Sequence, residues 1–132
     1  MDQPTDKRSR LAELAKKYNL GKEDFFKIHN TVIITRTGVE KIASVAKISL
    51  DYNIVALDLT NKEVCIECNA TMPADNGVKL VTTFGESTPY NTKNAYPVAM
   101  AEKRAKARAI LMLTEFYSEG VYSEDEADDF KR

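Results

Sequence analysis

The chain has 132 residues, of which 43% are hydrophobic and 30% are charged, and its formal net charge is −1. These values are typical of a single soluble globular domain. Its apolar runs are too short for a membrane span, and its first residues lack the apolar core of a secretory signal, which excludes those two classes of segment. We therefore expect a cytoplasmic protein.

Short helices and one strand are predicted in the first third of the chain. Residues 8–18 carry apolar side chains at helical spacing, and residues 22–29 suit a second helical turn or an ordered loop. The β-branched run 31–35 predicts a short strand. Thr37 opens a Thr-Gly-Val-Glu string that fits a capping box, so a helix is expected from there to about Lys47.

Three successive strands are predicted in the middle of the chain. From Ile48 apolar and polar residues alternate, which predicts a strand to Leu59, a turn at 60–62 and a second strand over 63–72. A polar loop and a third strand over 78–84 follow. The sequence thus predicts an α+β fold, a three-stranded antiparallel β-meander backed by one long helix, with short N-terminal helices and an acidic C-terminal tail.

Two cysteines in the second strand, Cys65 and Cys68, form a Cys-x-x-Cys string. An odd spacing in a strand sends the two side chains to opposite faces of the sheet. A structural zinc site also needs four ligands, and His29 is the only histidine. We therefore expect ordinary buried or half-buried thiols and no metal site at these cysteines.

The longest helix is predicted over residues 94–117. Pro97 suits a first helical position, and no further Gly or Pro occurs before Gly120. One face carries a stripe of mostly small apolar residues, which lets a helix lie close against a sheet. The stripe consists of Val98, Ala101, Ala105, Ala109, Met112 and Phe116. A second apolar face, expected to pack between elements or between subunits, consists of Ile110, Leu111 and Tyr117.

Positive charge is densest on the flanks of this helix, at Lys103, Arg104, Lys106 and Arg108. Residues 119–129 then hold six acids and no base; without them and the two terminal bases, 17 basic and 14 acidic residues remain. A basic body with an acidic tail is one pattern of a polyanion binder whose tail competes for its own groove. A tail that only adds solubility is the alternative. We divide the chain into a domain over 1–118 and a tail over 119–132.

The loop that enters the helix is polar. Residues 85–94 offer many small hydrogen-bond donors suited to phosphate contact, and Lys93 adds a positive charge. Tyr90 and Tyr96 flank its second half, where packing at the start of the helix is one interpretation.

No catalytic arrangement is apparent in the sequence. A nucleophile–base pair would have to recruit His29, and nothing near it in sequence organises it. A metal nuclease would need Glu63, Glu67 and Glu86 to converge, which the sequence does not establish. We therefore expect a protein that is not an enzyme.

Two local strings accompany the strand-strand-strand-helix order. Phe84-Gly85-Glu86-Ser87 ends the third strand, and Glu102-Lys103-Arg104-Ala105 lies in the helix. Over roughly residues 48–117 this arrangement resembles the core of the single-strand annealing proteins of the Rad-fifty-two superfamily, which includes phage annealing recombinases.

The resemblance implies a homo-oligomer that holds single-stranded DNA, rather than RNA, in a basic groove and anneals it during phage or bacterial recombination. Annealing of this kind needs no cofactor, and the resemblance implies a bacterial or phage-infected cytoplasm. The implied phosphate contacts are Lys93, Lys103, Arg104, Lys106 and Arg108, the stacking residues are Tyr90 and Tyr96, and the subunit contacts are Ile110, Leu111 and Tyr117. The alternative is a non-enzymatic adaptor that docks a protein partner through the apolar helix end and the acidic tail.

Overall fold

The structure, a computed structural model, describes residues 7–92 and 95–130, with side chains from 9 to 92 and from 95 to 127. Lys93 therefore lies outside the described residues. Over the described ranges the fold is α+β, with three α-helices and two three-stranded sheets. Within the same ranges, no helix combines the length and the apolar character that a membrane span requires.

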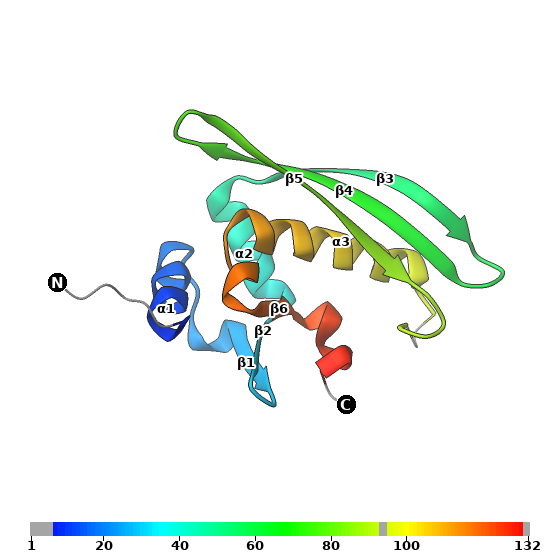
Figure 1. Cartoon of the computed structure of the whole chain (residues 1–132), viewed down its shortest axis with the longest axis horizontal. Coiled ribbons are helices and arrows are strands. Elements are labelled where there is room, and N and C mark those ends of the chain that lie inside the picture. Colours follow the sequence, from blue (N-terminus) through cyan, green and yellow to red (C-terminus); the bar gives the residue numbers. More distant parts are fainter. Residues whose placement is uncertain (1–6, 93–94, 131–132) are drawn as a thin grey trace.

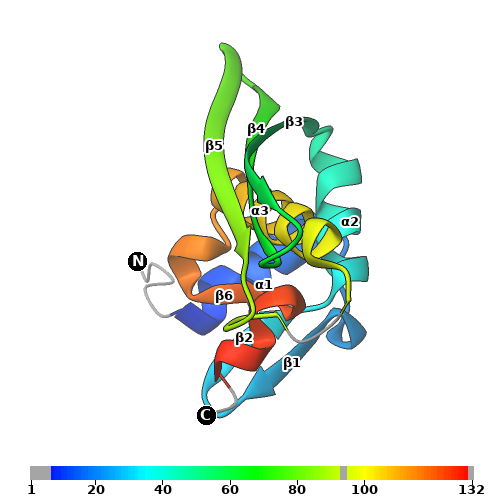
Figure 2. The same ribbon diagram turned by 90° about the vertical axis from the view of Figure 1, so that its right-hand side faces the viewer.

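The larger sheet is the predicted meander. Its antiparallel strands are β3 (Ser49–Asp58), β4 (Glu63–Ala74) and β5 (Gly77–Ser87), with β4 in the centre. The long helix α3 (Pro97–Leu113) crosses one face of this sheet, and the other face is open (Figures 1 and 2). The predicted order of three strands followed by a long helix is confirmed.

Strand β4 shows the alternation that the sequence predicts. Val64, Ile66, Cys68 and Ala70 point toward α3 and are at most 4% exposed. Cys65 lies on the opposite face, as its odd spacing predicts, and both thiols are free. Burial is the largest reason that the pKa of Cys68 is raised to about 11.

The close approach of α3 to the sheet depends on small side chains. The central alanines of the predicted stripe are all 0% exposed: Ala101, Ala105 and Ala109. Gly85 of β5 lies against them, and a Cβ atom there would stand 2.0 Å from the Ala101 carbonyl oxygen. The buried part of the stripe is shorter than predicted, since Val98 and Met112 are 39% and 44% exposed.

Helix α3 is also shorter than predicted. It ends at Leu113 rather than near Tyr117, because Thr114 leaves helical geometry and Glu115 adopts a φ of 71°. The chain then turns, and Phe116 enters the core of a second lobe, where it is 0% exposed.

The second lobe packs on the side of α3 that faces away from the meander (Figure 1). Its helices are α1 (Lys7–Lys17) and α2 (Arg36–Ala46), and its short turns are η1 (Lys22–Asp24), η2 (Tyr117–Glu119) and η3 (Glu124–Phe130). Its sheet has the order β1 (Phe25–Ile28), β2 (Thr31–Ile34) and β6 (Val121–Ser123). Strand β2 pairs antiparallel with β1 and parallel with β6.

Two predictions in this lobe are wrong in detail. Residues 25–28, expected as helical turn or loop, form a strand because they pair with β2. The N-cap of α2 is Thr35 rather than Thr37, since the Thr35 hydroxyl accepts a hydrogen bond from the Gly38 amide at 3.0 Å.

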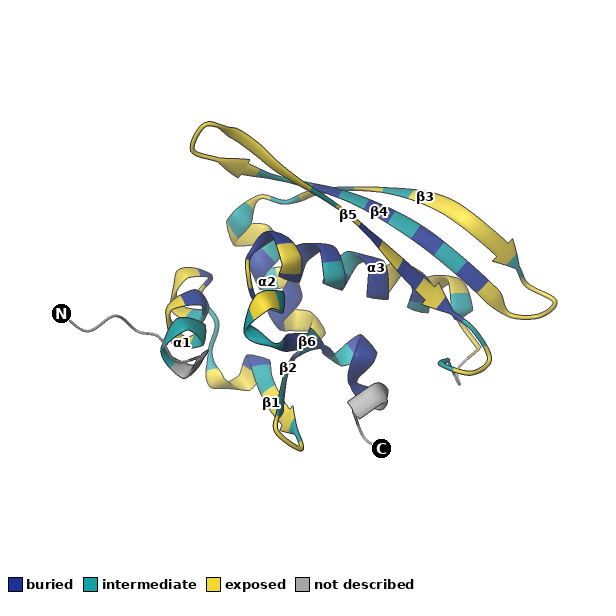
Figure 3. Cartoon of the chain, in the orientation of Figure 1, coloured by how far each residue is buried: buried dark blue, intermediate teal, exposed yellow. Residues whose placement is uncertain are grey.

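The acidic C-terminal segment is part of the fold, which corrects the expectation of a separate tail. Its first residues form β6 against β2. Asp125, Glu126 and Ala127, just beyond that strand, are only 8%, 7% and 6% exposed (Figure 3). The segment folds back because basic side chains of the body hold its carboxylates.

Candidate nucleic-acid interface

A polar groove runs between the N-terminal half of α2, the middle of α3 and the turn η3. Its volume is about 140 Å³. Its lining consists of Arg36, Val39, Glu40, Glu102, Lys103, Lys106, Ala107 and Asp125. Three cations and three carboxylates therefore face one another here, and their formal charges cancel.

Two of the predicted phosphate contacts, Lys103 and Lys106, line this groove. Lys103 is exposed and forms no ion pair with the described residues. Lys106 forms an ion pair with Glu40 of α2, and its side chain keeps 27% of its surface exposed. An exposed ammonium on a flexible stem can reach a backbone phosphate without any change in the fold.

Arg104 has a different role from the predicted one. It is 7% exposed, and its guanidinium donates to the carbonyl oxygens of Glu86, Asn91 and Asp125 at 2.9, 2.7 and 3.4 Å. It also donates to the side-chain oxygens of Asn91 and Thr92 at 3.2 and 2.8 Å. The predicted phosphate contact is not supported, because this side chain faces the interior and positions the loop that carries Tyr90.

Arg108 is also engaged within the protein. It donates to the Phe84 carbonyl at 2.6 Å and pairs with Glu86 at 3.0 Å and with Glu126 at 2.5 Å. Its side chain is 20% exposed. Burial disfavours its charge, but the two carboxylates outweigh this effect and raise the pKa of the guanidinium. Arg108 therefore ties β5 and the C-terminal segment to α3.

Arg36 is a groove residue that the sequence analysis missed. Its Nε donates to Asp125 at 2.7 Å and its backbone amide donates to Glu124 at 2.6 Å, yet its side chain is 53% exposed. The hydrogen bond to Asp125 is the largest reason that the pKa of Arg36 is raised. The charge was visible in the sequence, but its position beside α3 depends on how α2 packs.

The two predicted stacking residues are exposed. Tyr90 and Tyr96 are 87% and 70% exposed, so neither is buried at the start of the helix. The loop between β5 and α3 is fixed by internal bonds, such as the Thr88 amide to Asn91 Oδ1 at 2.7 Å and the Ser87 hydroxyl to Thr92 Oγ1 at 2.6 Å. The small polar groups expected to contact phosphate are thus partly used to hold the loop.

The predicted subunit contacts lie inside the protomer. Ile110 and Leu111 are 0% exposed and pack in the core of the second lobe with Phe116. Tyr117 is half-buried, with its ring 5.3 Å from that of Tyr122. Of the two expected locations for this apolar face, between elements or between subunits, the first is observed for Ile110 and Leu111.

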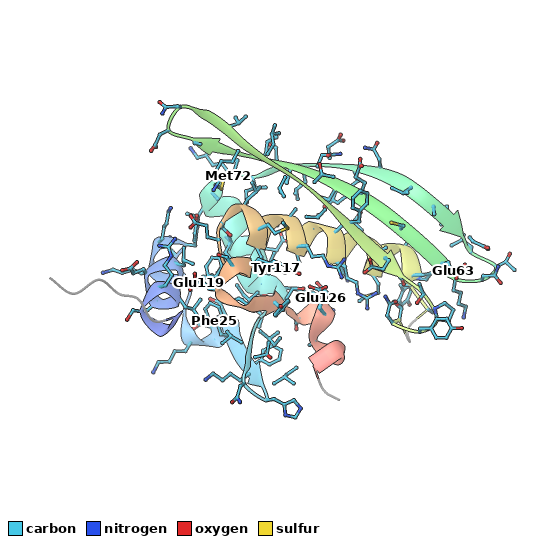
Figure 4. All side chains as sticks on the ribbon, viewed as in Figure 1. Phe25, Glu63, Met72, Tyr117, Glu119 and Glu126 are labelled. Carbon is cyan, nitrogen blue, oxygen red and sulfur yellow. The ribbon has the colours of Figure 1, made fainter. Side chains whose placement is uncertain are left out.

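The three carboxylates considered for a metal site have separate partners. Glu67 accepts from Asn53 and Asn69 at 2.9 and 3.0 Å, while Glu86 pairs with Arg108. Glu63 lies at the far end of the β3–β4 hairpin (Figure 4). Within the ranges that the structure covers, no group of three or more His, Cys, Asp or Glu side chains is placed to hold a metal ion.

The described residues thus bring Arg36, Lys103 and Lys106 into one groove, on a body that also carries two exposed tyrosines, Tyr90 in the β5–α3 loop and Tyr96 at the start of α3. Comparisons with protein-family models, curated proteins and solved structures find no match.

Proposed function

We propose that this protein binds single-stranded DNA without sequence preference and promotes its annealing, as a non-catalytic component of phage or bacterial recombination in the cytoplasm. The observation that carries the proposal is Lys103, which is exposed and has no ion pair among the described residues, in a groove whose other two cations are held by carboxylates. The sequence strings Phe84–Ser87 and Glu102–Ala105, which resemble those of the annealing proteins, support the same function.

The groove suits a nucleic-acid backbone better than a small ligand. Lys103, Lys106 and Arg36 offer point charges and one guanidinium to successive phosphates, which gives affinity that depends on salt and not on sequence. Tyr90 and Tyr96 offer exposed aromatic faces, and stacking contributes about 1–3 kcal/mol per base. Such a site positions strands and neutralises charge, so it needs neither cofactor nor bond chemistry.

Self-assembly is part of this proposal, but through surfaces other than the predicted ones. The edge strand β3 and its following turn expose a β3 patch, Ile54, Leu57 and Leu59, at 63%, 49% and 61%. The opposite edge strand exposes a β5 patch, Val78 and Leu80, at 64% and 72%. Exposed apolar side chains on two different edges favour head-to-tail contacts between copies, which generate rings or filaments.

The test is the binding of a fluorescently labelled single-stranded DNA oligonucleotide, measured by anisotropy at two salt concentrations. We expect the double variant Lys103→Ala, Lys106→Ala to bind about tenfold more weakly at low salt. The slope of log affinity against log salt should fall by about 1.4, since each lost contact with a single strand removes about 0.7.

The matched control is Lys16→Ala with Lys22→Ala, which removes the same charge from exposed positions around α1. It should leave affinity and slope close to those of the wild type. Equal binding by both double variants would refute the groove assignment, and no binding by the wild-type protein would refute the function.

The adaptor alternative retains one specific observation in its favour. A second groove, of about 540 Å³ and mainly apolar, lies between α1 and β1. Its lining includes Leu11, Leu20, Phe25, Phe26 and Val32. The originally expected docking surfaces do not serve this alternative, because Ile110 and Leu111 are buried and the acidic segment is folded in through Ala127. Absence of DNA binding at low salt would make this groove the leading candidate site.

A further inference from the structure

The acidic segment that follows β6 is seated on the basic residues beside the groove. Asp125 accepts from Arg36 Nε at 2.7 Å, and its side chain is 4% exposed. Glu126 accepts from Arg108 Nε at 2.7 Å, and its side chain is 8% exposed. Figure 4 places Glu126 below α3, on the side of the second lobe. The segment thus presents consecutive carboxylates to two arginines of the body.

The site that holds the acidic segment leaves some of the segment's polar atoms without hydrogen bonds. Both Arg108 contacts, from Nε and from Nη2, go to the same oxygen of Glu126, and the other oxygen, Oε2, is buried without a partner. Ser123 Oγ, just before the segment, is also buried without one. These two are the buried side-chain polar atoms that lack a hydrogen bond within the described ranges. An unpaired buried polar group destabilises the bound arrangement, so the segment is held less firmly than its ion pairs indicate.

The segment also determines the charge of the groove. Asp125 is one of the three carboxylates that cancel Arg36, Lys103 and Lys106. If the segment leaves, the groove lining holds three cations and only Glu40 and Glu102 as anions. Arg36 then has no remaining carboxylate partner among the described residues, while Arg108 keeps Glu86. A neutral groove becomes a positive one.

We propose that Arg36 and Arg108 form a phosphate-binding track that the chain's own segment 124–126 occupies until nucleic acid displaces it. The ligand of this track is the phosphodiester backbone of a single strand, whose oxygens replace carboxylate oxygens on the same guanidinium groups. The proposal rests on the proposed function, adds Arg108 to its phosphate contacts, and identifies an internal competitor for Arg36 and Arg108. Displacement exchanges one set of anions for another, so neither arginine is left unpaired in the bound state.

The first test compares two full-length triple variants of equal charge change. Glu124→Gln, Asp125→Asn and Glu126→Gln neutralise the segment with side chains of the same shape. Asp51→Asn, Glu63→Gln and Asp75→Asn neutralise three exposed acids of the β-meander. We expect the segment variant to bind the labelled oligonucleotide at least about tenfold more tightly than the wild type, and the sheet variant to gain no more than about threefold from the change in net charge.

The second test uses the wild-type protein, so it does not depend on the folding of a variant. Amide hydrogen exchange over residues 124–127 should rise when the oligonucleotide is added, whereas ordinary ligand binding lowers exchange. Unchanged or lower exchange there overturns the proposal, and so does a folded segment variant that gains no more affinity than the sheet variant. In those outcomes the wild type still binds DNA, and the proposed function stands. If the wild type and both triple variants all fail to bind the oligonucleotide, this proposal and the proposed function are both refuted.

Discussion

At the scale of single residues, Asp24 ties three parts of the second lobe together. Its carboxylate accepts from the Gly21 amide at 2.9 Å and from Lys41 of α2 at 3.0 Å, and its carbonyl accepts from the Thr35 amide at 2.9 Å. The side chain is 2% exposed. Burial acts to raise its pKa, but the Gly21 amide and Lys41 together outweigh that effect and hold the pKa below its ordinary value.

This pairing predicts a pH dependence of stability. Because the folded-state pKa of Asp24 is lowered, its contribution is fully present above the unfolded pKa of about 3.9 and is lost as pH falls through the lower folded value. We expect Asp24→Asn to reduce the free energy of unfolding at pH 7 by about 1–3 kcal/mol. Urea unfolding at a series of pH values should show the difference from wild type shrinking below about pH 4.

Asp75→Asn, at an exposed position in the β4–β5 turn, is the control and should not change stability. A difference between wild type and Asp24→Asn that stays constant from pH 7 to pH 3 would show that the ionised carboxylate is not the stabilising form.

Neighbouring residues of α3 show what the sequence can and cannot reveal at this scale. Helical spacing placed Lys103, Arg104, Lys106 and Arg108 on the flanks of the helix, and that much is correct. It did not reveal that Arg104 is buried while Lys103 is exposed. The difference depends on which flank the β5–α3 loop and the C-terminal segment cover, and both contacts join residues distant in sequence.

At the scale of elements, α3 is shared by two cores. Its alanines pack under the meander, and its Ile110 and Leu111 pack in the second lobe. The distance between helix and sheet is limited at Gly85, where a Cβ would also stand 2.5 Å from the Ala105 amide nitrogen. Backbone atoms cannot move aside in the way that the end of a flexible side chain can. This contact therefore fixes the register of β5 on α3.

We therefore expect Gly85→Ala to lower the free energy of unfolding by about 1–3 kcal/mol or more through overpacking, as measured by urea denaturation. The matched change on the same strand is Leu80→Ala, whose side chain is 72% exposed and whose loss should cost less than about 0.5 kcal/mol. Equal effects of the two substitutions would mean that the sheet moves away from the helix at little cost.

The elements that the sequence predicted well are those with long local patterns. Strands β3, β4 and β5 are each ten or more residues long, burial alternates over most of β4, and α3 carries its stripe over several turns. Strands β1 and β6, of four and three residues, were missed, whereas β2, also of four residues, was predicted from its β-branched run. Their identity as strands depends on pairing with β2, and the β6 partner lies near the other end of the chain. No local periodicity encodes such a pairing.

At the scale of the whole molecule, the meander ends in two unlike edges. The β3 patch and the β5 patch flank the central strand β4, and each exposes large apolar side chains. If copies associate head to tail, the β3 patch of one copy meets the β5 patch of the next. Each copy then carries one half of two different contacts.

This geometry predicts a complementation experiment. We expect Leu57→Asp and Leu80→Asp, which each place a charge in one patch, to be monomeric by size-exclusion chromatography with multi-angle light scattering at concentrations where the wild type assembles. An equimolar mixture of the two should form dimers and nothing larger, because it retains one intact contact per pair.

Thr60→Asp, which adds the same charge in the exposed β3–β4 turn, is the control and should assemble normally. Full assembly of either single variant, or a wild type that is monomeric throughout, would show that these patches are not the subunit contacts.

The parallel pairing of β2 with β6 has a consequence for biosynthesis. Translation produces the β1–β2 hairpin first, but its third strand, with Val121 opposite Val32, is made only after the meander and α3. A two-stranded hairpin alone is only marginally stable, and Ile33 and Ile34, which are fully buried in the finished chain, lack part of their cover until then. The meander and α3 are synthesised before that point, so the first sheet of the sequence is the last to be completed. The nascent chain therefore completes this lobe only after α3 has been made.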